Sequence, residues 1–186
     1  PKVHSRGRHV YVANNYAEFL AIKHRKCMEN GWYASELIDK ASECRVYVME
    51  GRVISIADKT PENPEDVAWN VAQGGEFKVK RWDDWDFGAI DVAIKAHNLT
   101  GLDFSGVEFM TDKERKSYVI EVNSAPSLPL HNDGSTSYRQ QCMAKGFRYI
   151  MENGKGNVAP AEEVIENWRD AIHPAIWMPK EMRKAA

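Results

Sequence analysis

Two carboxylates and an amide lie close together in the sequence, in a pattern that suits a hard cation. Glu108 lies in one short β-rich run, and Glu121 and Asn123 lie in the next. Side chains alternate between the two faces of a strand, so adjacent strands would place all three on one face. Such oxygen ligands are preferred by Mg²⁺ alongside substrate phosphates, and neighbouring buried carboxylates are costly without a cation. The pattern predicts a nucleotide and metal site; the alternative is a hairpin with solvated carboxylates.

The elements that must position these side chains are two adjacent strands and a helix that precedes them. The strands are predicted at residues 106–109 and 118–123, joined by a charged turn. The helix is predicted to begin at Asp83 or Asp84 and to run to His97. The stripe of this helix that faces the core is expected to contain Ile90, Ala93, Ile94 and His97.

The other elements are predicted from the same periodicities. Upstream we expect a strand at 10–12, a helix from 15 to about 29, a strand at 32–38, a hairpin of 44–49 and 52–57, an exposed loop at 59–67 and a strand at 76–81. Asn15 and Glu18 would form a capping box, and Glu50 with Gly51 would form the hairpin turn. Downstream we expect a loop at 124–135, a helix at 136–151, a linker at 154–160 and a last helix at 161–172. This order predicts an α+β fold in which helices pack on antiparallel sheets.

Composition and charge are those of an ordinary globular protein. The chain has 186 residues, of which 43% are hydrophobic and 28% charged, and its formal net charge is −2. A charge this small predicts no bulk attraction to nucleic acid or to a membrane. No apolar run is long enough to span a bilayer, and the start does not resemble a signal peptide. The three unclustered cysteines favour a reducing cytoplasm and argue against a zinc site or a disulfide framework.

Four motifs follow one another along the chain. They are His-Ser-Arg-Gly-Arg at 4–8, Glu-Leu-Ile at 36–38 with Glu-Cys-Arg at 43–45, Trp-Asn at 69–70 with Gly-Gly at 74–75, and Gly-Val-Glu at 106–108 with Glu-Val-Asn at 121–123. In this order and spacing they resemble the C-terminal catalytic half of ATP-grasp carboxylate–amine ligases, in particular glutamate ligases that add amino acids to protein or peptide carboxyls, phage-encoded copies included. The resemblance runs from His4 to about Leu130, and its motifs are specific only when taken together.

The resemblance implies a binding site for ATP and Mg²⁺. Glu108, Glu121 and Asn123 correspond to ligands of one or two Mg²⁺ ions at the β- and γ-phosphates, although the family often has Asp at the first position. The segment Ser5, Arg6 and Gly7 corresponds to the flap over the triphosphate. Backbone groups of Glu36, with apolar contacts from Leu37 and Ile38, would bind the adenine.

Further contacts to the nucleotide and the substrate follow from the same resemblance. Glu43 matches the carboxylate that binds the ribose hydroxyls, with a surface acid as the alternative. Asn70 matches an asparagine near the phosphates, but Trp69 stands before it where many relatives have arginine. His9 replaces the second glycine of the flap.

Two basic residues are the candidates for catalytic roles. Arg45 matches an arginine that lines the active site in relatives, and a cross-strand salt bridge is the alternative. Lys59 lies near the position at which relatives keep an arginine for the reacting carboxylate. For Lys59 the alternative is a surface ion pair with Asp58.

By resemblance the chain is expected to form an amide bond between a carboxylate and an amine through an acyl phosphate. Its domains would be a catalytic part at 1–135, with lobes at about 1–38 and 39–135, and a helical extension at 136–186. Pro1 stands where a methionine would begin a complete protein, so we expect a fragment or processed product. The N-terminal lobe and two phosphate-binding basic residues would then come from a missing segment or a partner chain. The alternative is a non-catalytic nucleotide-binding or structural protein on a degraded ATP-grasp scaffold.

Overall fold

The fold is an α+β arrangement built on one antiparallel sheet, as the sequence predicts. The computed structural model describes residues 9–26, 32–80, 84–128, 137–156, 158 and 171–176. Its elements in chain order are α1 (Tyr16–Arg25), β1 (Lys40–Met49), β2 (Arg52–Thr60), the short 3₁₀ helix η1 (Val71–Gln73), β3 (Glu76–Val79), α2 (Phe87–Thr100), β4 (Phe104–Asp112), β5 (Ser117–Asn123) and α3 (Tyr138–Asn153). None of the helices in the described part is long and apolar enough to cross a bilayer.

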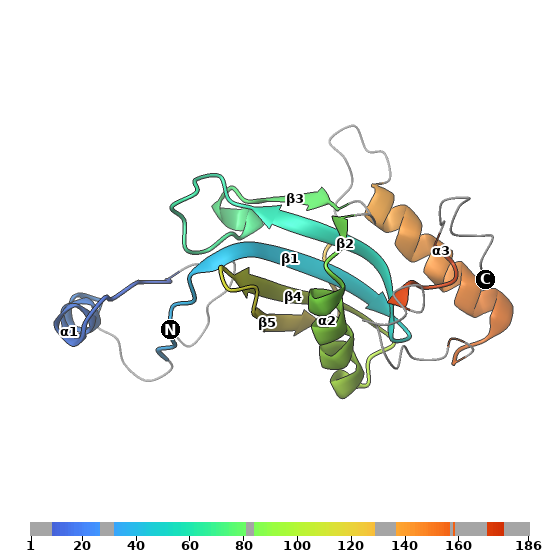
Figure 1. The fold of residues 1–186 in the computed structure, drawn as a ribbon, viewed down its shortest axis with the longest axis horizontal. Helices are drawn as coiled ribbons and strands as arrows, with labels where there is room; N and C mark the ends of the chain where they lie inside the picture. The colour runs from blue at the N-terminus through green and yellow to red at the C-terminus, as the bar shows by residue number, and fades with distance from the viewer. Residues whose placement is uncertain are drawn as a thin grey trace.

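The sheet has five strands in the order β3-β2-β1-β4-β5, and all four neighbouring pairs are antiparallel. β1 therefore lies at the centre, and α1 and α3 lie near opposite ends of the sheet in Figure 1. The predicted β1–β2 hairpin is confirmed. Its turn residues Glu50 and Gly51 have φ angles of 49° and 73°. Positive φ at both central positions gives a turn whose twist matches that of the strands.

One face of the sheet packs against α2. The even-numbered β1 residues Cys44, Val46 and Val48 belong to this core, and the predicted stripe of α2 is buried against them. The helix begins later than expected, because Asp86 rather than Asp83 or Asp84 caps it. The carboxylate of Asp86 accepts hydrogen bonds from the N–H groups of Gly88 and Ala89, which would otherwise lack partners in the first turn.

The opposite face packs against α3 over only part of its area. Tyr47 and Met49 of β1 form this second core together with Cys142 of α3. The predicted helix here is confirmed, and it begins at Tyr138 behind a capping box formed by Ser137 and Gln140. The remainder of this face of β1, toward its N-terminal end, carries charged side chains instead.

Two predicted strands are wrong, because residues 10–12 and 32–38 form no strand. Tyr33 and Leu37 are exposed, at 78% and 56%. Neither segment pairs with an edge of the described sheet, and an extended segment without a pairing partner is not stable as a strand. The predicted capping box of α1 is only half formed. The side chain of Asn15 accepts a hydrogen bond from the Glu18 N–H at 2.9 Å, but the Glu18 carboxylate accepts from the backbone N–H of Asn14 and from the side-chain amide of Asn15 instead of from the Asn15 N–H.

Several predicted boundaries move, and others cannot be compared. β1 begins at Lys40 rather than at residue 44, and β2 continues to Thr60, so the loop predicted at 59–67 begins two residues later. The end predicted for the first helix and most of the last predicted helix lie outside the described residues. Of the latter, Ala171 and Ile172 are buried, and Ile172 forms an isolated bridge with Val53.

The buried His97 makes stability depend on pH. Its Nδ1 lies 2.8 Å from the Ser105 hydroxyl, and burial, opposed by Asp103, lowers its pKa below 6.5. The unfolded state therefore takes up a proton first, and the free energy of unfolding should fall as the pH drops below about 6.5, by up to about 1.4 kcal/mol per pH unit for one proton. Between pH 7.5 and pH 5.5, the free energy of unfolding measured in urea should fall less steeply with pH for His97→Gln than for the wild-type protein. The exposed His24→Gln is the control, and equal slopes in all three proteins would contradict the assignment.

Gly106 allows the loop after β5 to lie against the sheet. A Cβ at this position would lie 2.7 Å from Pro126 Cβ and 3.3 Å from Arg45 Cδ, which is overpacking. Gly106→Ala should destabilise the fold by about 1–3 kcal/mol. Removing the opposing Cβ with Pro126→Gly should reduce that cost by at least half in a double-mutant cycle measured by denaturant unfolding. An equal cost in both backgrounds would show that the close approach is unimportant.

Candidate active site

A buried cluster of opposite charges lies on the half of the sheet that α3 does not cover. β1 contributes Glu43 and Arg45, β2 contributes Lys59, and β4 contributes Glu108. In the strand register Glu43 is opposite Lys59, and Arg45 is opposite Glu108. Directly opposite residues on antiparallel strands project their side chains to the same face, so the sheet itself brings the four together.

The ion pairs in this cluster are short and shielded from solvent. The Lys59 ammonium lies 2.5 Å from a Glu43 oxygen and 2.7 Å from Glu108 Oε2, and Arg45 pairs with the other Glu108 oxygen. Lys40 lies at the rim, 2.8 Å from the second Glu43 oxygen. Lys59 and Glu108 are each only 4% exposed. Both oxygens of each acid therefore contact a cation.

The charged forms of these groups stabilise one another. Burial alone would raise the pKa of Glu108, but Arg45 and Lys59 outweigh it, so the pKa of Glu108 is lowered. Burial would lower the pKa of Lys59, but Glu43 and Glu108 raise it overall. Burial would also lower the pKa of Arg45, but Glu108 raises it overall, so Arg45, Lys59 and Glu108 are all charged at neutral pH.

Both predicted catalytic residues lie in this cluster. The surface ion pair considered for Lys59 is wrong, because Asp58 projects to the other face and pairs with Lys80 at 3.3 Å. Strand alternation separates the neighbours Asp58 and Lys59. For Arg45 the salt-bridge alternative is confirmed, and the bridge joins it to Glu108.

The predicted metal ligands lie on the same face, as expected. Glu121 is opposite Glu108 in the strand register, and Asn123 is opposite Gly106. Glu121 is exposed, and its carboxylate accepts a hydrogen bond from the Asn123 amide at 2.8 Å. That bond leaves the amide oxygen of Asn123 available as a ligand.

The donor set fits a hard cation. Glu108, Glu121 and Asn123 offer only oxygen ligands, and an oxygen of Glu108 that already accepts from a cation retains a further lone pair. Within the described residues, no group of three or more His, Cys, Asp or Glu side chains is arranged to hold a metal ion. The predicted set contains only two side chains of those types, and its third ligand is an amide.

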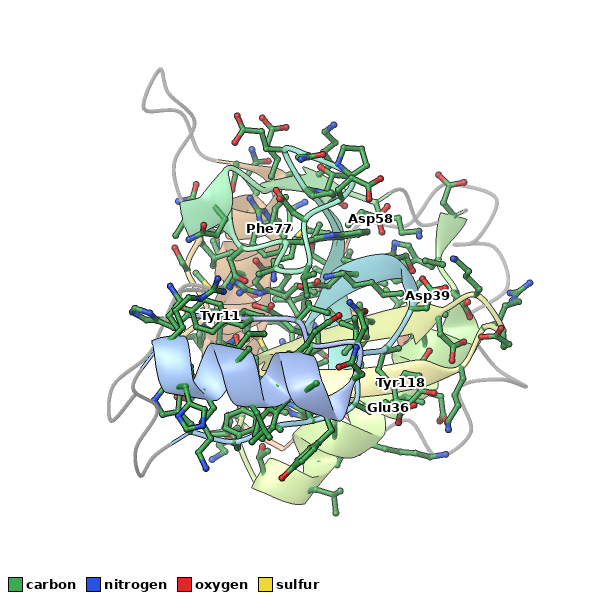
Figure 2. All side chains as sticks on the ribbon, turned by 90° about the vertical axis from the view of Figure 1, so that its left-hand side faces the viewer. Tyr11, Glu36, Asp39, Asp58, Phe77 and Tyr118 are labelled. Carbon is green, nitrogen blue, oxygen red and sulfur yellow. The ribbon has the colours of Figure 1, made fainter. Side chains whose placement is uncertain are left out.

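Three residues near the cluster were not predicted. The ring of Phe77, on β3, lies 4.6 Å from the Arg45 guanidinium, 5.6 Å from the Lys59 ammonium and 5.4 Å from the Arg139 guanidinium. Arg139, on α3, also donates to the hydroxyl of Tyr47 at 3.2 Å. Figure 2 shows this part of the sheet from the end at which α1 lies in front, with Phe77 and Asp58 labelled above the helix.

Different signals bear on these three positions. The alternation of residues 76–81 could have placed Phe77 on this face. Tyr47 follows Arg45 at the next same-face position, so it too could have been placed there. Nothing local in the sequence connects Arg139 to the sheet.

The predicted nucleotide-binding segments lie around the start of β1. Glu36, Leu37 and Ile38 lead into this strand, and Ile38 O accepts a hydrogen bond from Lys40 N at 2.9 Å. Asn70 O accepts hydrogen bonds from the N–H groups of Gln73 and Gly75 in the turn at η1.

Trp69, the residue before Asn70, packs beneath a cation of the rim. The Lys40 ammonium lies 4.3 Å from the centre of the Trp69 ring. Trp69 therefore does not supply a cation itself, and its ring instead contacts the cation of Lys40 at the rim. Ser5, Arg6 and Gly7 lie outside the described residues.

Comparison with known proteins identifies the family. A family model described as "RimK-like ATP-grasp domain" matches residues 3–139, whereas no curated protein sequence matches the chain significantly. Among solved structures, the ATP-grasp ligase PsnB complexed with a minimal precursor is 18% identical, with a TM-score of 0.40. That match covers 59% of this chain and 34% of PsnB.

A second solved structure is the Chryseobacterium gregarium RiPP-associated ATP-grasp ligase, in complex with ADP and a leader and core peptide. It is 16% identical over 50% of this chain and 28% of that chain, with a TM-score of 0.37. The chain thus spans about a third of the length of these two ligases. Because the family match extends over well more than half of its residues, this chain belongs to the RimK-like ATP-grasp domain family.

Proposed function

We propose that this chain is the catalytic part of an ATP- and Mg²⁺-dependent ligase that joins a carboxylate to an amine through an acyl phosphate. The main support is the buried, ion-paired cluster of Glu43, Arg45, Lys59 and Glu108 on the half of the sheet that α3 does not cover. Family membership supports ATP as the nucleotide. The proposed substrates are an amino acid, peptide or protein carboxylate and an amine.

The nucleotide would lie along the N-terminal half of β1. Backbone groups of residues 36–38 would bind the adenine, and Glu43 would accept hydrogen bonds from the ribose hydroxyls. Glu43 is suited to this role because Lys59 and Lys40 each contact one of its oxygens and hold the carboxylate in position. By the resemblance, Asn70 and the segment Ser5, Arg6 and Gly7 would contact the phosphates.

Glu108, Glu121 and Asn123 would hold Mg²⁺ at the β- and γ-phosphates. When bound, the ion neutralises the charge that develops on the transferred phosphoryl group. Glu121 is exposed and is held only by the hydrogen bond from Asn123, whereas Glu108 is held by its two cations. The chain thus offers one fixed and one adjustable carboxylate.

The proposed reaction has two steps. A carboxylate oxygen attacks the γ-phosphorus, the bond to the β-phosphate oxygen breaks, and ADP leaves. The amine nitrogen then attacks the acyl carbon, inorganic phosphate leaves, and the nitrogen gives up a proton to solvent. Arg45 and Lys59 would stabilise the negative oxygens of the phosphoryl group, which is electrostatic catalysis by groups already in position.

A non-catalytic role on the same scaffold is the second candidate. Glu108 is already neutralised by Arg45 and Lys59, so the cluster does not need a metal to be stable. Trp69 also replaces a cation that many relatives keep. A purely structural cluster would have no Mg²⁺-dependent affinity for ATP.

Glu121 gives a clean test, because its exposed side chain does not support the core. In the natural full-length protein, Glu121→Ala should weaken Mg²⁺-dependent ATP binding at least tenfold, or about 1.4 kcal/mol, without changing thermal stability. Isothermal titration calorimetry with and without Mg²⁺ measures this. Glu114→Ala, on the turn of the same hairpin, is the matched control and should bind like wild type.

Two results would count against this account. Unchanged affinity in Glu121→Ala would remove Glu121 from the metal site. Failure of the wild-type protein to bind ATP in the presence of Mg²⁺ would reject the ligase proposal and favour the structural role.

A further inference from the structure

Arg139 is a buried cation that has no anion beside it in the described part of the chain. It lies in the first turn of α3 and is only 8% exposed. Its guanidinium donates to the Tyr47 hydroxyl and lies over the Phe77 ring. Among the described residues, no carboxylate forms an ion pair with it. Burial of a charge in this way is costly unless an anion or several acceptors compensate it.

Two hydrogen-bond donors at this place also lack acceptors. The Nε–H groups of Arg139 and of Arg45 are both buried, and neither has a partner within the described part of the chain. Both guanidinium groups lie near the Phe77 ring. Buried donors are nearly always paired, so two unpaired guanidinium donors beside one ring indicate a ligand that would supply the acceptors.

The balance of charges also indicates an anionic ligand. The buried cluster and its neighbour contain three cations, Arg45, Lys59 and Arg139, against two acids, Glu43 and Glu108. One positive charge is left over, before Lys40 at the rim is counted. The Tyr47 hydroxyl accepts from Arg139, so its own proton remains available to an oxyanion.

The position of Arg139 along β1 indicates which anion of the proposed reaction it would bind. Glu43, Arg45 and Tyr47 occupy successive positions on one face of β1, about 6.6 Å apart at the usual rise of a strand. If the ribose lies at Glu43 and the phosphates at Arg45, the Tyr47 and Arg139 end lies beyond the γ-phosphate. The attacking carboxylate must approach from that end, because it reacts opposite the leaving ADP.

We propose that Arg139 and the Tyr47 hydroxyl bind the carboxylate of the acceptor substrate. The choice of the acceptor carboxylate as the ligand rests on the proposed ligase function, which sets the order of ribose, phosphates and acceptor along β1. The anion site itself rests only on the unpaired buried donors. The guanidinium fork suits a carboxylate, which can accept two parallel hydrogen bonds from it. The competing explanation is that Arg139 only fastens α3 to the sheet.

The direct test follows the Nε–H of Arg139 by ¹⁵N NMR in the full-length protein with Mg-ADP. The signal is assigned by its loss in Arg139→Lys. Sodium acetate serves as the carboxylate probe and inorganic phosphate as the phosphoryl probe, both at constant ionic strength. We expect acetate to shift this signal saturably, because it provides the missing acceptor.

Variants with substitutions in α3 are compared for their affinities for acetate and for Mg-ADP. Arg139→Met keeps an unbranched apolar stem, and it should weaken acetate binding at least tenfold while leaving the affinity for Mg-ADP within twofold. Arg139→Lys should fall between it and wild type. Arg148→Met, an exposed arginine of α3, is the matched control and should match wild type in both measurements.

Each other outcome overturns the proposal in a recognisable way. An Nε–H signal that neither probe moves would leave Arg139 a purely structural residue. A response to phosphate alone, or a tenfold loss of Mg-ADP affinity in Arg139→Met, would place it in the nucleotide phosphate site. If the wild-type protein fails to bind Mg-ADP, the ligase proposal fails, but acetate titration of the nucleotide-free protein still decides whether Arg139 binds a carboxylate.

Discussion

Glu108 remains charged in a buried position because Arg45 and Lys59 each contact one of its oxygens. Glu108 and its two partners come from three different strands, so the arrangement depends on the register of β1 with β2 and with β4. Loss of one partner of a buried pair typically costs about 3–5 kcal/mol, since it leaves a charge uncompensated. The position of the proposed site and the stability of the central strands are thus tied to the same contacts.

The sheet face that carries this cluster is divided between packing and chemistry. Toward the end of β1, Tyr47 and Met49 pack under α3, whereas Glu43 and Arg45, toward its start, lie outside the area that α3 covers. The area covered by α3 ends at the first turn of this helix, next to the charged side chains of the cluster. A single side chain there, Arg139, can therefore belong to the core and also reach a ligand.

The sequence predicted those features that depend on local patterns. The β1–β2 hairpin followed from Glu50-Gly51, the buried stripe of α2 from its helical period, and the common face of Glu108 and Glu121 from strand alternation. The ion pairs of Lys59 and the contacts of Arg139 could not be predicted, because they depend on strand register and helix docking between residues far apart in the chain. The strand predicted at 32–38 was wrong for a related reason, since its β-rich composition could not show that no described edge pairs with it.

The charged face of the sheet is proposed to hold Mg²⁺ and ATP. A crystal structure of the full-length protein with Mg²⁺ and a non-hydrolysable ATP analogue would show whether it does. We expect a metal about 2.1 Å from oxygens of Glu108, Glu121 and Asn123, with the ribose at Glu43 and the γ-phosphate between Arg45 and Lys59. A nucleotide bound elsewhere, with the cluster unchanged and no metal at Glu121, would contradict it.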